Sequence, residues 1–311
     1  MKKVIAIALL LLSLSVNAVE TYPFAQKDTS TLYLDIHRAT VGSETSIDGI
    51  SKPTILYVFG GGFKMGTRDG AYLLPWFKLL NDNGYTVIAI DYRLGMKGYK
   101  MGKGLAGLAQ SVNRFCNAQQ LGVEDVFSAI AYLSKHPELS IDVNNIVAAG
   151  SSAGAIISLA SAYALSNGTA AEVPEGFALK GVMSFAGAII SVHGAPKFKT
   201  NPCPILFFHG MQDNAVAYHH FSAFGKGMWG SSYLAEKIKK KGANYSIYRF
   251  NNRAHDVASY LTQLWPEEHA FLEKNVMQGD VRIVDATVDD PALPEWKEWG
   301  QMTPQEMYNG D

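Results

Sequence analysis

The strongest chemical signal in the sequence is a serine between glycines at residues 150–154, which are GSSAG. An apolar segment of strand length, residues 146–149, precedes it, and a helical segment of small residues follows it. A serine at such a strand–turn–helix connection has a strained backbone, and flanking glycines relieve the crowding. The pattern predicts that Ser152 is a nucleophile at a helix N-terminus. The alternative is a serine that only caps a glycine-rich helix start.

A second signal is the sequence GGGF at residues 60–63, which follows another apolar segment and precedes Ser152 by about ninety residues. Glycine backbones can approach a ligand closely and turn their N–H groups toward it. Together with the later serine, these glycines predict a pocket for the negatively charged oxygen of a reaction intermediate. A phosphate-binding loop is disfavoured because no Gly-Lys-Ser/Thr sequence follows. A flexible turn remains the alternative.

A serine hydroxyl becomes a nucleophile when a base removes its proton and a carboxylate orients that base. His255 lies in a polar loop directly after an apolar strand segment, and Asp213 ends the sequence HGMQD after another one. The order serine, aspartate, histidine along the chain is the one that this kind of serine motif requires. We therefore expect Asp213 to orient His255 and His255 to act on Ser152. An ordinary Asx turn is the alternative for Asp213.

Other acids and histidines are weaker candidates for these roles. Asp256 adjoins His255 and is expected to point elsewhere, and Asp91 precedes the nucleophile and is expected to pair with Arg93. His269 has the surroundings of a solvated helix position.

These segments, together with DYRL at residues 91–94, resemble α/β-hydrolases of the esterase/lipase group, namely hormone-sensitive-lipase-like and type-B carboxylesterase-like enzymes. The resemblance extends from about residue 50 to residue 275. It implies that the backbone N–H groups of Gly61, Gly62 and Ala153 form an oxyanion hole. Two positions depart from the family pattern: Phe59 stands where the family usually has histidine, and Ser151 stands where an acidic residue is frequent.

The elements that must position these residues alternate between strand and helix patterns. This alternation predicts an α/β fold, a mainly parallel sheet flanked by helices, with loop insertions near the catalytic edge. We expect strands at residues 55–59, 86–90, 145–149, 180–185, 205–208 and 245–250, and helices at residues 123–136, 153–165, 231–241 and 266–274.

Two long connections, residues 94–122 and 214–230, interrupt the alternation. Long connections usually have a function or carry structure of their own, and on this fold they gather at the catalytic edge. We expect both to border the substrate pocket. The candidate pocket residues are Phe63, Ser151, Tyr218, His219 and Trp229.

The composition excludes several classes of protein. With 27 basic and 28 acidic residues and 48% hydrophobic residues, the chain can form a large core and lacks the basic surface that nucleic acid binding needs. His209, Asp213, His219 and His220 do not have the spacing of a known metal motif, so we expect neither a metal nor another cofactor. The two cysteines, Cys116 and Cys203, permit at most one disulfide, which the sequence leaves open.

The ends of the chain differ from its middle. Two lysines, an apolar run too short to span a membrane and a small-residue site predict a signal peptide at residues 1–18, hence export to the periplasm or the exterior. We assign residues 19–284 to the hydrolase domain and residues 285–311 to a polar tail. Within the tail, TPQE at residues 303–306 predicts a helical capping box, to which no chemistry is assigned.

The combined prediction is a secreted serine hydrolase that cleaves esters through an acyl-enzyme. The expected substrate is a small to medium acyl or aromatic ester, with a carbohydrate-linked ester included because of the predicted export and Trp229. The alternatives are a secreted serine peptidase of the same fold and a non-catalytic binding protein on a hydrolase scaffold. The sequence does not predict an oligomeric state.

Overall fold

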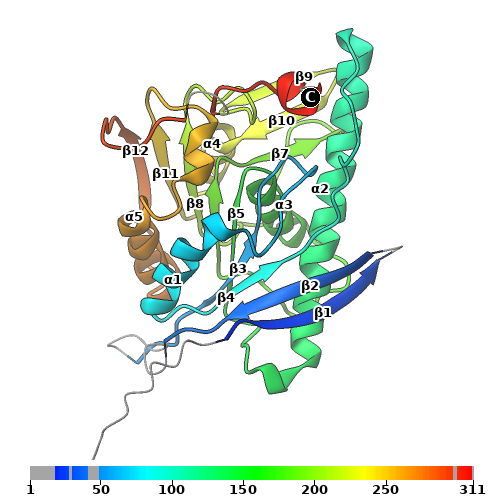
Figure 1. Ribbon diagram of the computed structural model, residues 1–311. Coiled ribbons are helices and arrows are strands. Elements are labelled where there is room, and N and C mark those ends of the chain that lie inside the picture. The colour runs from blue at the N-terminus through cyan, green and yellow to red at the C-terminus, as the bar shows by residue number, and fades with distance from the viewer. Residues whose placement is uncertain (1–17, 28–29, 41–48, 297–299, 310–311) are drawn as a thin grey trace, which may run out of the picture.

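A nine-stranded sheet forms the centre of the molecule (Figure 1), with the strand order β1-β2-β4-β3-β5-β6-β8-β11-β12. The computed structural model describes residues 18–27, 30–40, 49–296 and 300–309, so nearly all of the predicted signal peptide lies outside the described residues. β2 pairs antiparallel with both β1 and β4, and every other neighbouring pair in this sheet is parallel. The predicted fold class, a mainly parallel α/β sheet, is confirmed.

The sheet strands are β1 (Glu20–Lys27), β2 (Ser30–His37), β3 (Thr54–Val58), β4 (Val87–Ile90), β5 (Ile146–Ser151), β6 (Gly181–Phe185), β8 (Ile205–Gly210), β11 (Tyr245–Phe250) and β12 (Ile283–Val288). A small antiparallel sheet contains β7 (Ala188–Ser191), β10 (Lys226–Gly230) and β9 (His220–Ala223) in that order. The helices are α1 (Leu74–Asp82), α2 (Gly104–Lys135), α3 (Ala153–Asn167), α4 (Ser231–Lys240), α5 (Trp265–Ala270) and α7 (Pro304–Asn309). Shorter helical turns are η1 (Ala71–Leu73), η2 (Pro137–Leu139), η3 (His255–Ser259) and η4 (Phe271–Met277).

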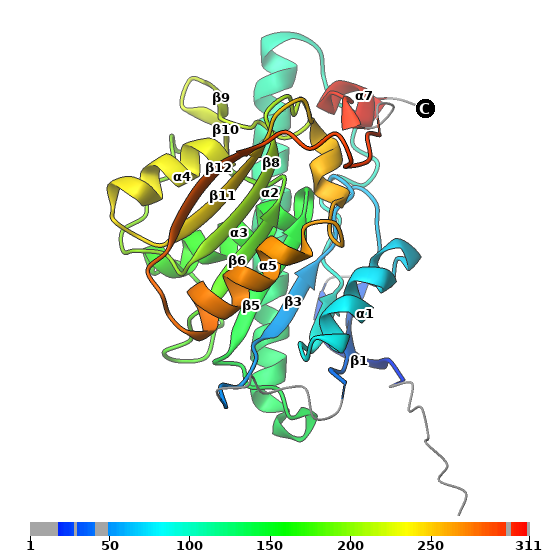
Figure 2. The same cartoon turned by 90° about the vertical axis from the view of Figure 1, so that its left-hand side faces the viewer.

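Helices cover both faces of the large sheet (Figures 1 and 2). α1 and α5 lie on one face, and α2 and α3 lie on the other. All residues of β3, β4, β5, β6 and β8 are buried, as expected for strands with helices on both sides. The six predicted strands are all present, and in these five continuous burial leaves a continuous apolar signal in the sequence.

The first long connection, residues 94–122, is mostly helix and so carries structure of its own, as expected; the predicted start of the helix at residue 123 is wrong. α2 begins at Gly104 and continues to Lys135, well before the predicted start at residue 123. Two of the glycines within this helix, Gly107 and Gly122, are sites of close packing. A side chain at Gly122 would collide with Ile157 of α3, so this glycine lets the two helices approach each other.

The second long connection carries structure of its own, as expected. Residues 220–230 fold into the hairpin β9–β10, and β10 pairs with β7 to build the small sheet. Figure 1 shows this sheet at the end of the molecule where α7 also lies. The carboxyl ends of β5 and β8 lie at the same end of the molecule.

The C-terminal region is part of the fold, which corrects the assignment of residues 285–311 to a separate polar tail. β12 pairs in parallel with β11 along its whole length, so the boundary between residues 284 and 285 falls inside a strand. The capping box is confirmed: the Thr303 N–H donates to Glu306 Oε2 at 2.7 Å, and the Glu306 N–H donates to Thr303 Oγ1 at 3.3 Å. The helix that it starts, α7, contacts the glycine-rich loop that follows β3.

Cys116 and Cys203 are both free thiols, which answers the question that the sequence left open. Burial raises the pKa of both, that of Cys203 to about 12, so neither is a reactive thiolate near neutral pH. No helix in the described part of the chain combines the length and apolar surface that a bilayer crossing needs.

Candidate active site

Three polar side chains from distant parts of the chain meet at the carboxyl edge of the large sheet. Ser152 follows β5, Asp213 follows β8, and His255 follows β11. His255 Nε2 lies 2.8 Å from Ser152 Oγ, and His255 Nδ1 lies 2.7 Å from Asp213 Oδ2. All three residues are less than a tenth exposed. The structure thus brings the predicted nucleophile, base and acid into one hydrogen-bonded chain.

Ser152 occupies a sharp turn between β5 and α3. Its backbone has φ 52° and ψ −117°, a conformation that costs a non-glycine residue roughly 1–3 kcal/mol. Side chains at Gly150 or Gly154 would collide with neighbouring backbone, Gly150 with Gly154 itself and Gly154 with Val58 of β3. The two glycines therefore permit the turn that places the Ser152 hydroxyl above the sheet.

Asp213 has a donor at every one of its accepting positions. Oδ1 accepts the N–H groups of Ala215 at 2.9 Å and Val216 at 2.8 Å, and Oδ2 faces His255. Burial by itself raises the pKa of this carboxyl, but the neighbouring His255 and a hydrogen bond from His209 outweigh burial and hold the pKa well below its usual range. Asp213 therefore stays ionised, as a residue that orients an imidazole must.

His209, the second histidine on this carboxylate, has no role among those expected from the sequence. His209 is fully buried at the end of β8, and its Nε2 lies 3.2 Å from both Asp213 Oδ2 and Val216 O. Both oxygens can only accept a hydrogen bond, so Nε2 carries the hydrogen. Nδ1 lies 2.8 Å from Ser231 Oγ at the start of α4. The sequence HGMQD contains both residues, and the short turn between them could have indicated that His209 contacts Asp213.

The competing acids lie elsewhere. Asp256 accepts hydrogen bonds from the Ala254 N–H and the Tyr260 hydroxyl and points away from His255, as expected. The expected pair between Asp91 and Arg93 is wrong: Asp91 pairs with Arg68 at 2.9 Å. Arg93 instead reaches α2, where Asp125 and Glu124 both accept from it.

The glycine-rich loop lies against the Ser152 turn. A Cβ on Gly60 would lie 3.0 Å from Ser151 Oγ and 3.4 Å from Ser152 Cβ. Within the described part of the chain, the N–H groups of Gly61 and Gly62 have no backbone acceptor. The N–H of Ala153 is the first of α3 and has no partner inside its helix. Unsatisfied N–H groups next to a serine hydroxyl can stabilise a negatively charged oxygen.

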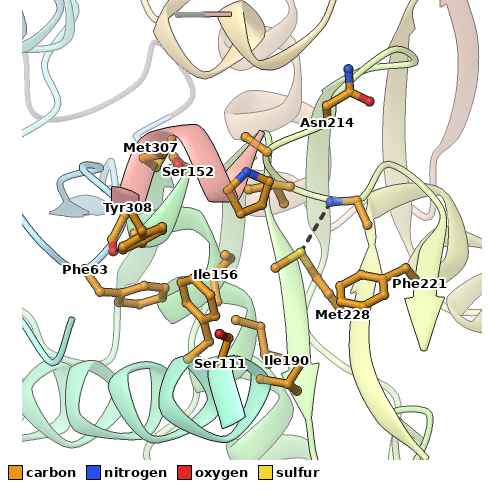
Figure 3. A pocket seen from close by; sticks show the side chains of 18 of the residues that line it. Phe63, Ser111, Ser152, Ile156, Ile190, Asn214, Phe221, Met228, Met307 and Tyr308 are labelled. Atoms are coloured by element: carbon orange, nitrogen blue, oxygen red, sulfur yellow. Dashed lines mark hydrogen bonds between the residues drawn. The ribbon is translucent and has the colours of Figure 1, made fainter. Parts of the chain in front are cut away.

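A cavity of about 350 Å³ opens beside Ser152, within the size range of small-molecule sites (Figure 3). Its walls are mostly apolar and come from distant elements, including Ile156 of α3, Ile190 of β7, Met228 of β10 and Met307 of α7. Among the described lining residues the only ionisable group with a charge at neutral pH is Asp213. The cavity therefore fits an uncharged, apolar group better than a polar one.

Of the five pocket residues predicted from the sequence, only Phe63 lines this cavity. Ser151 points into the core, 3.1 Å from the Tyr57 hydroxyl, because successive residues of a strand face opposite sides. The same alternation turns Trp229 away while Met228 lines the cavity. Tyr218 lies behind the acid, where its hydroxyl accepts a hydrogen bond from Arg249 at 2.6 Å, and His219 is exposed beside Glu236.

Sequence reasoning missed the contribution of the C-terminal helix. Met307 and Tyr308 of α7 form part of the cavity wall (Figure 3), and the Tyr308 hydroxyl donates a hydrogen bond to Gly62 O. The amphipathic pattern of so short a helix is too weak to show which side faces the protein. The capping box indicated that a helix begins there but not where that helix packs.

Among the described residues, no three His, Cys, Asp or Glu side chains form a group that could hold a metal ion. Of the four residues considered for such a group, His209 and Asp213 are in contact inside the protein. His219 and His220 lie on the surface, with their Nδ1 atoms 2.7 Å apart.

Comparison with known sequences gives partial matches. Residues 113–247 match the family described as Phospholipase/Carboxylesterase. The acetyl esterase of Salmonella paratyphi B is 34% identical over 113 residues, which are 36% of this chain and 29% of that protein. Secreted lipase 5 of Gibberella zeae is 29% identical over 101 residues, which are 32% of this chain and 18% of that protein. The chain thus spans less than a third of the length of these curated relatives.

Comparison with solved structures covers more of the chain. The esterase Est2 of Thermogutta terrifontis with bound propionate superposes with a TM-score of 0.57 at 21% identity, over 83% of this chain and 95% of that one. The same enzyme phosphoramylated by tabun superposes with a TM-score of 0.55 at 20% identity, over the same shares of the two chains. At this identity the likeness concerns the fold.

Proposed function

Because this chain is an α/β-hydrolase with partial sequence matches among esterases and lipases, we propose that it is a serine hydrolase that cleaves carboxylic esters. Ser152 is the nucleophile, His255 the general base and acid, and Asp213 the residue that orients His255. The observation that supports this most directly is the hydrogen-bonded chain from Asp213 through His255 to Ser152 Oγ, next to unsatisfied backbone N–H groups and an apolar cavity.

In the proposed reaction, His255 Nε2 takes the proton of the Ser152 hydroxyl while Oγ attacks the ester carbonyl carbon. The carbonyl oxygen becomes an oxyanion, which the N–H groups of Gly61, Gly62 and Ala153 stabilise. The tetrahedral intermediate expels the alcohol, which receives the proton from His255, and an acyl group remains on Ser152. Water then attacks this acyl group by the same route, and the free acid leaves.

The substrate that we propose is an ester with an uncharged acyl or aromatic group of small to medium size. The apolar walls of the 350 Å³ cavity support this choice, since a polar group buried there would lose its hydrogen bonds to water. The alternative of a carbohydrate-linked ester was based on the predicted export and on Trp229. Because Trp229 is buried and turned away from the cavity, we do not carry that alternative further.

The alternative activity is cleavage of peptide amides by the same residues. An amide needs a protonated leaving amine and a groove that holds the chain on both sides of the scissile bond. The described residues of α7 and of the β9–β10 hairpin instead line one compact, mostly apolar cavity beside Ser152. We therefore favour esters, and a panel of p-nitrophenyl acyl esters and aminoacyl p-nitroanilides distinguishes the two activities.

The decisive variant is Ser152→Ala. It removes the nucleophile, and loss of a triad member costs on the order of a millionfold in turnover. We expect no measurable hydrolysis of p-nitrophenyl acetate and no reaction with a fluorophosphonate probe. Thermal unfolding should stay within a few degrees of the wild type, since the side chain is small and makes no contact essential to packing.

The matched control is Ser151→Ala, which removes a hydroxyl of the same size from the neighbouring position. Ser151 hydrogen-bonds to Tyr57 inside the core and does not reach the cavity. The Ser151→Ala variant should retain probe labelling and ester turnover. If Ser152→Ala hydrolyses esters at the wild-type rate, or if the probe labels a different residue, the proposed function is wrong.

A further inference from the structure

Carbonyl groups hold the glycine-rich loop in place, and two of them, those of Gly61 and Phe63, accept hydrogen bonds from backbone N–H groups. Gly61 O accepts the N–H groups of Lys64 at 3.0 Å and Met65 at 3.1 Å. Phe63 O accepts the Met96 N–H at 2.9 Å. In a trans peptide the N–H points opposite to the carbonyl before it, so the bonds to Gly61 O direct the following N–H away from Lys64 and Met65.

The carbonyl group of Gly62, between those of Gly61 and Phe63, is held by the C-terminal helix. Gly62 O accepts a hydrogen bond from the hydroxyl of Tyr308 in α7, a residue 246 positions away. Backbone conformation alone does not hold the loop here, because Gly61 and Gly62 both have positive φ angles that glycine enters and leaves at little cost. Phe63 is also at φ 58°, where a non-glycine residue persists only when its surroundings hold it.

We propose that Tyr308 is a positioning residue that fixes the Gly62–Phe63 peptide and so, together with the bonds that fix the Gly61–Gly62 peptide through Gly61 O, holds Gly62 in the place that the oxyanion hole requires. The inference rests on the proposed function, since an oxyanion forms only if Ser152 attacks a carbonyl group. Tyr308 does not touch the reacting atoms. It acts through the backbone of Gly62, and a displacement of about 1 Å at such a donor can cost a hundredfold in rate.

The surroundings of Tyr308 suit a fixed donor. The side chain is 3% exposed, and its ring packs edge-on against Phe115 of α2 with ring centroids 5.0 Å apart. Burial raises the pKa of its hydroxyl, which therefore stays protonated and able to donate. A side chain on Gly62 would lie 2.5 Å from the Tyr308 oxygen, so the contact also requires glycine at this position.

Helix α7 is itself anchored next to the cavity. Asn309 forms two hydrogen bonds with the backbone of Met101: the Met101 N–H donates to Oδ1 at 2.7 Å, and Nδ2 donates to Met101 O at 3.0 Å. The capping box between Thr303 and Glu306 begins the helix. Tyr308 is thus held from both sides, by the start of α7 and by Asn309.

The test is Tyr308→Phe, which removes only the hydroxyl. We expect kcat to fall by about tenfold to a hundredfold for both p-nitrophenyl acetate and p-nitrophenyl butyrate, because the oxyanion is common to both esters. KM should stay within about twofold, since the ring and the cavity wall remain. The rate of Ser152 labelling by a fluorophosphonate should fall in parallel with kcat. The control is Gln305→Ala, an exposed position of the same helix, which should match the wild type.

Equal labelling rates for the wild type and Tyr308→Phe would overturn the inference, and so would a loss confined to the longer ester, which would make Tyr308 only a wall of the cavity. A wild type that fails to label at all would instead overturn the proposed function. If Tyr308→Phe does not fold, Asn309→Ala, which loosens the anchor of α7, provides the same comparison. It should lower kcat for both esters without raising KM, and an unchanged kcat there would also reject the proposal.

Discussion

Asp213 is shared by two histidines, and only one of them reaches Ser152. His255 uses Nδ1 to contact the carboxylate and Nε2 to contact the serine, whereas His209 donates its Nε2 hydrogen from inside the protein. His209 and the N–H groups of Ala215 and Val216 together stabilise the ionised carboxylate in a site where burial opposes ionisation. His209 therefore positions the acid and keeps it charged.

The variants His209→Gln and His209→Asn test whether Asp213 needs the hydrogen bond that His209 donates. Glutamine can place its amide N–H near the Nε2 position and preserve the donor, whereas asparagine is too short to do so. A hydrogen bond to a charged group is worth about 1.5–3 kcal/mol, so we expect His209→Asn to lower kcat by roughly tenfold to a hundredfold. His209→Gln should recover most of that loss.

The pH profile provides the more specific readout. Without its donor, the pKa of the Asp213 carboxyl rises toward the usual value, so the carboxylate loses its charge at a higher pH. The acidic limb of kcat/KM should therefore move to higher pH in His209→Asn. His136→Asn, at a partly exposed histidine after α2, is the control. A uniform loss of activity in His209→Asn with an unshifted profile would contradict the role assigned to His209.

At the scale of elements, the packing of α5 against α1 contains a buried carboxyl group. Glu268 of α5 is fully buried, and its Oε2 accepts a hydrogen bond from Trp76 Nε1 of α1 at 2.8 Å. Burial raises the pKa of this carboxyl well above its usual value, with Trp76 opposing the shift and Glu267 adding to it. The two helices thus pack around a carboxyl that prefers to be neutral.

The prediction for this element pair is that Glu268→Gln stabilises the protein at neutral and basic pH. In the wild type, the unfolded chain releases the Glu268 proton at about pH 4.3 while the folded protein retains it, so unfolding becomes easier as pH rises from there to the folded pKa. The slope is at most about 1.4 kcal/mol per pH unit. Glutamine has no proton to release, so the free energy of unfolding of the variant does not fall with pH for this reason.

Urea unfolding from about pH 5 to about pH 8 measures the effect. The difference in free energy of unfolding between Glu268→Gln and wild type should grow with pH. Glu267→Gln, the partly exposed neighbour, should show no such growth. A difference that shrinks with rising pH would have the wrong sign and would reject a buried neutral carboxyl.

At the scale of the whole molecule, the described fold starts directly after the predicted signal peptide. β1 begins at Glu20, whose carboxylate pairs with Arg38 at 2.7 Å, and β1 forms one edge of the large sheet. Removal of residues 1–18 would thus leave every described element intact. We propose that the protein is exported and cleaved after Ala18.

Export is tested by expressing the full chain in a Gram-negative host and sequencing the N-terminus of the product. We expect the mature protein to begin at Val19 and to lie outside the cytoplasm. A variant without residues 2–18 should remain in the cytoplasm and retain full ester hydrolysis, since every described helix and strand begins after residue 18. Full-length protein in the cytoplasm with Met1 in place would contradict the proposal.

How much of this could be predicted from the sequence differs between the sheet and the site. Five of the six predicted strands are buried throughout, which leaves continuous apolar runs in the sequence. The missed β1, β2 and β12 lie toward the edges of the sheet and have exposed or half-buried residues. Ser152, Asp213 and His255 could be chosen because each directly follows a strand whose carboxyl end reaches the same edge. In a parallel sheet, residues that directly follow the strands are brought to the same edge.

The cavity could not be predicted in this way. Its walls depend on which face of β10 turns inward, on the length of α2 and on the return of α7 to the loop at Gly62. The fold class and the three residues that meet at the sheet edge could be predicted from the sequence, because strand burial and turn chemistry are local properties. Tertiary structure alone decided the shape of the cavity and the roles of His209 and Tyr308, because contacts between side chains far apart in the chain leave no local pattern.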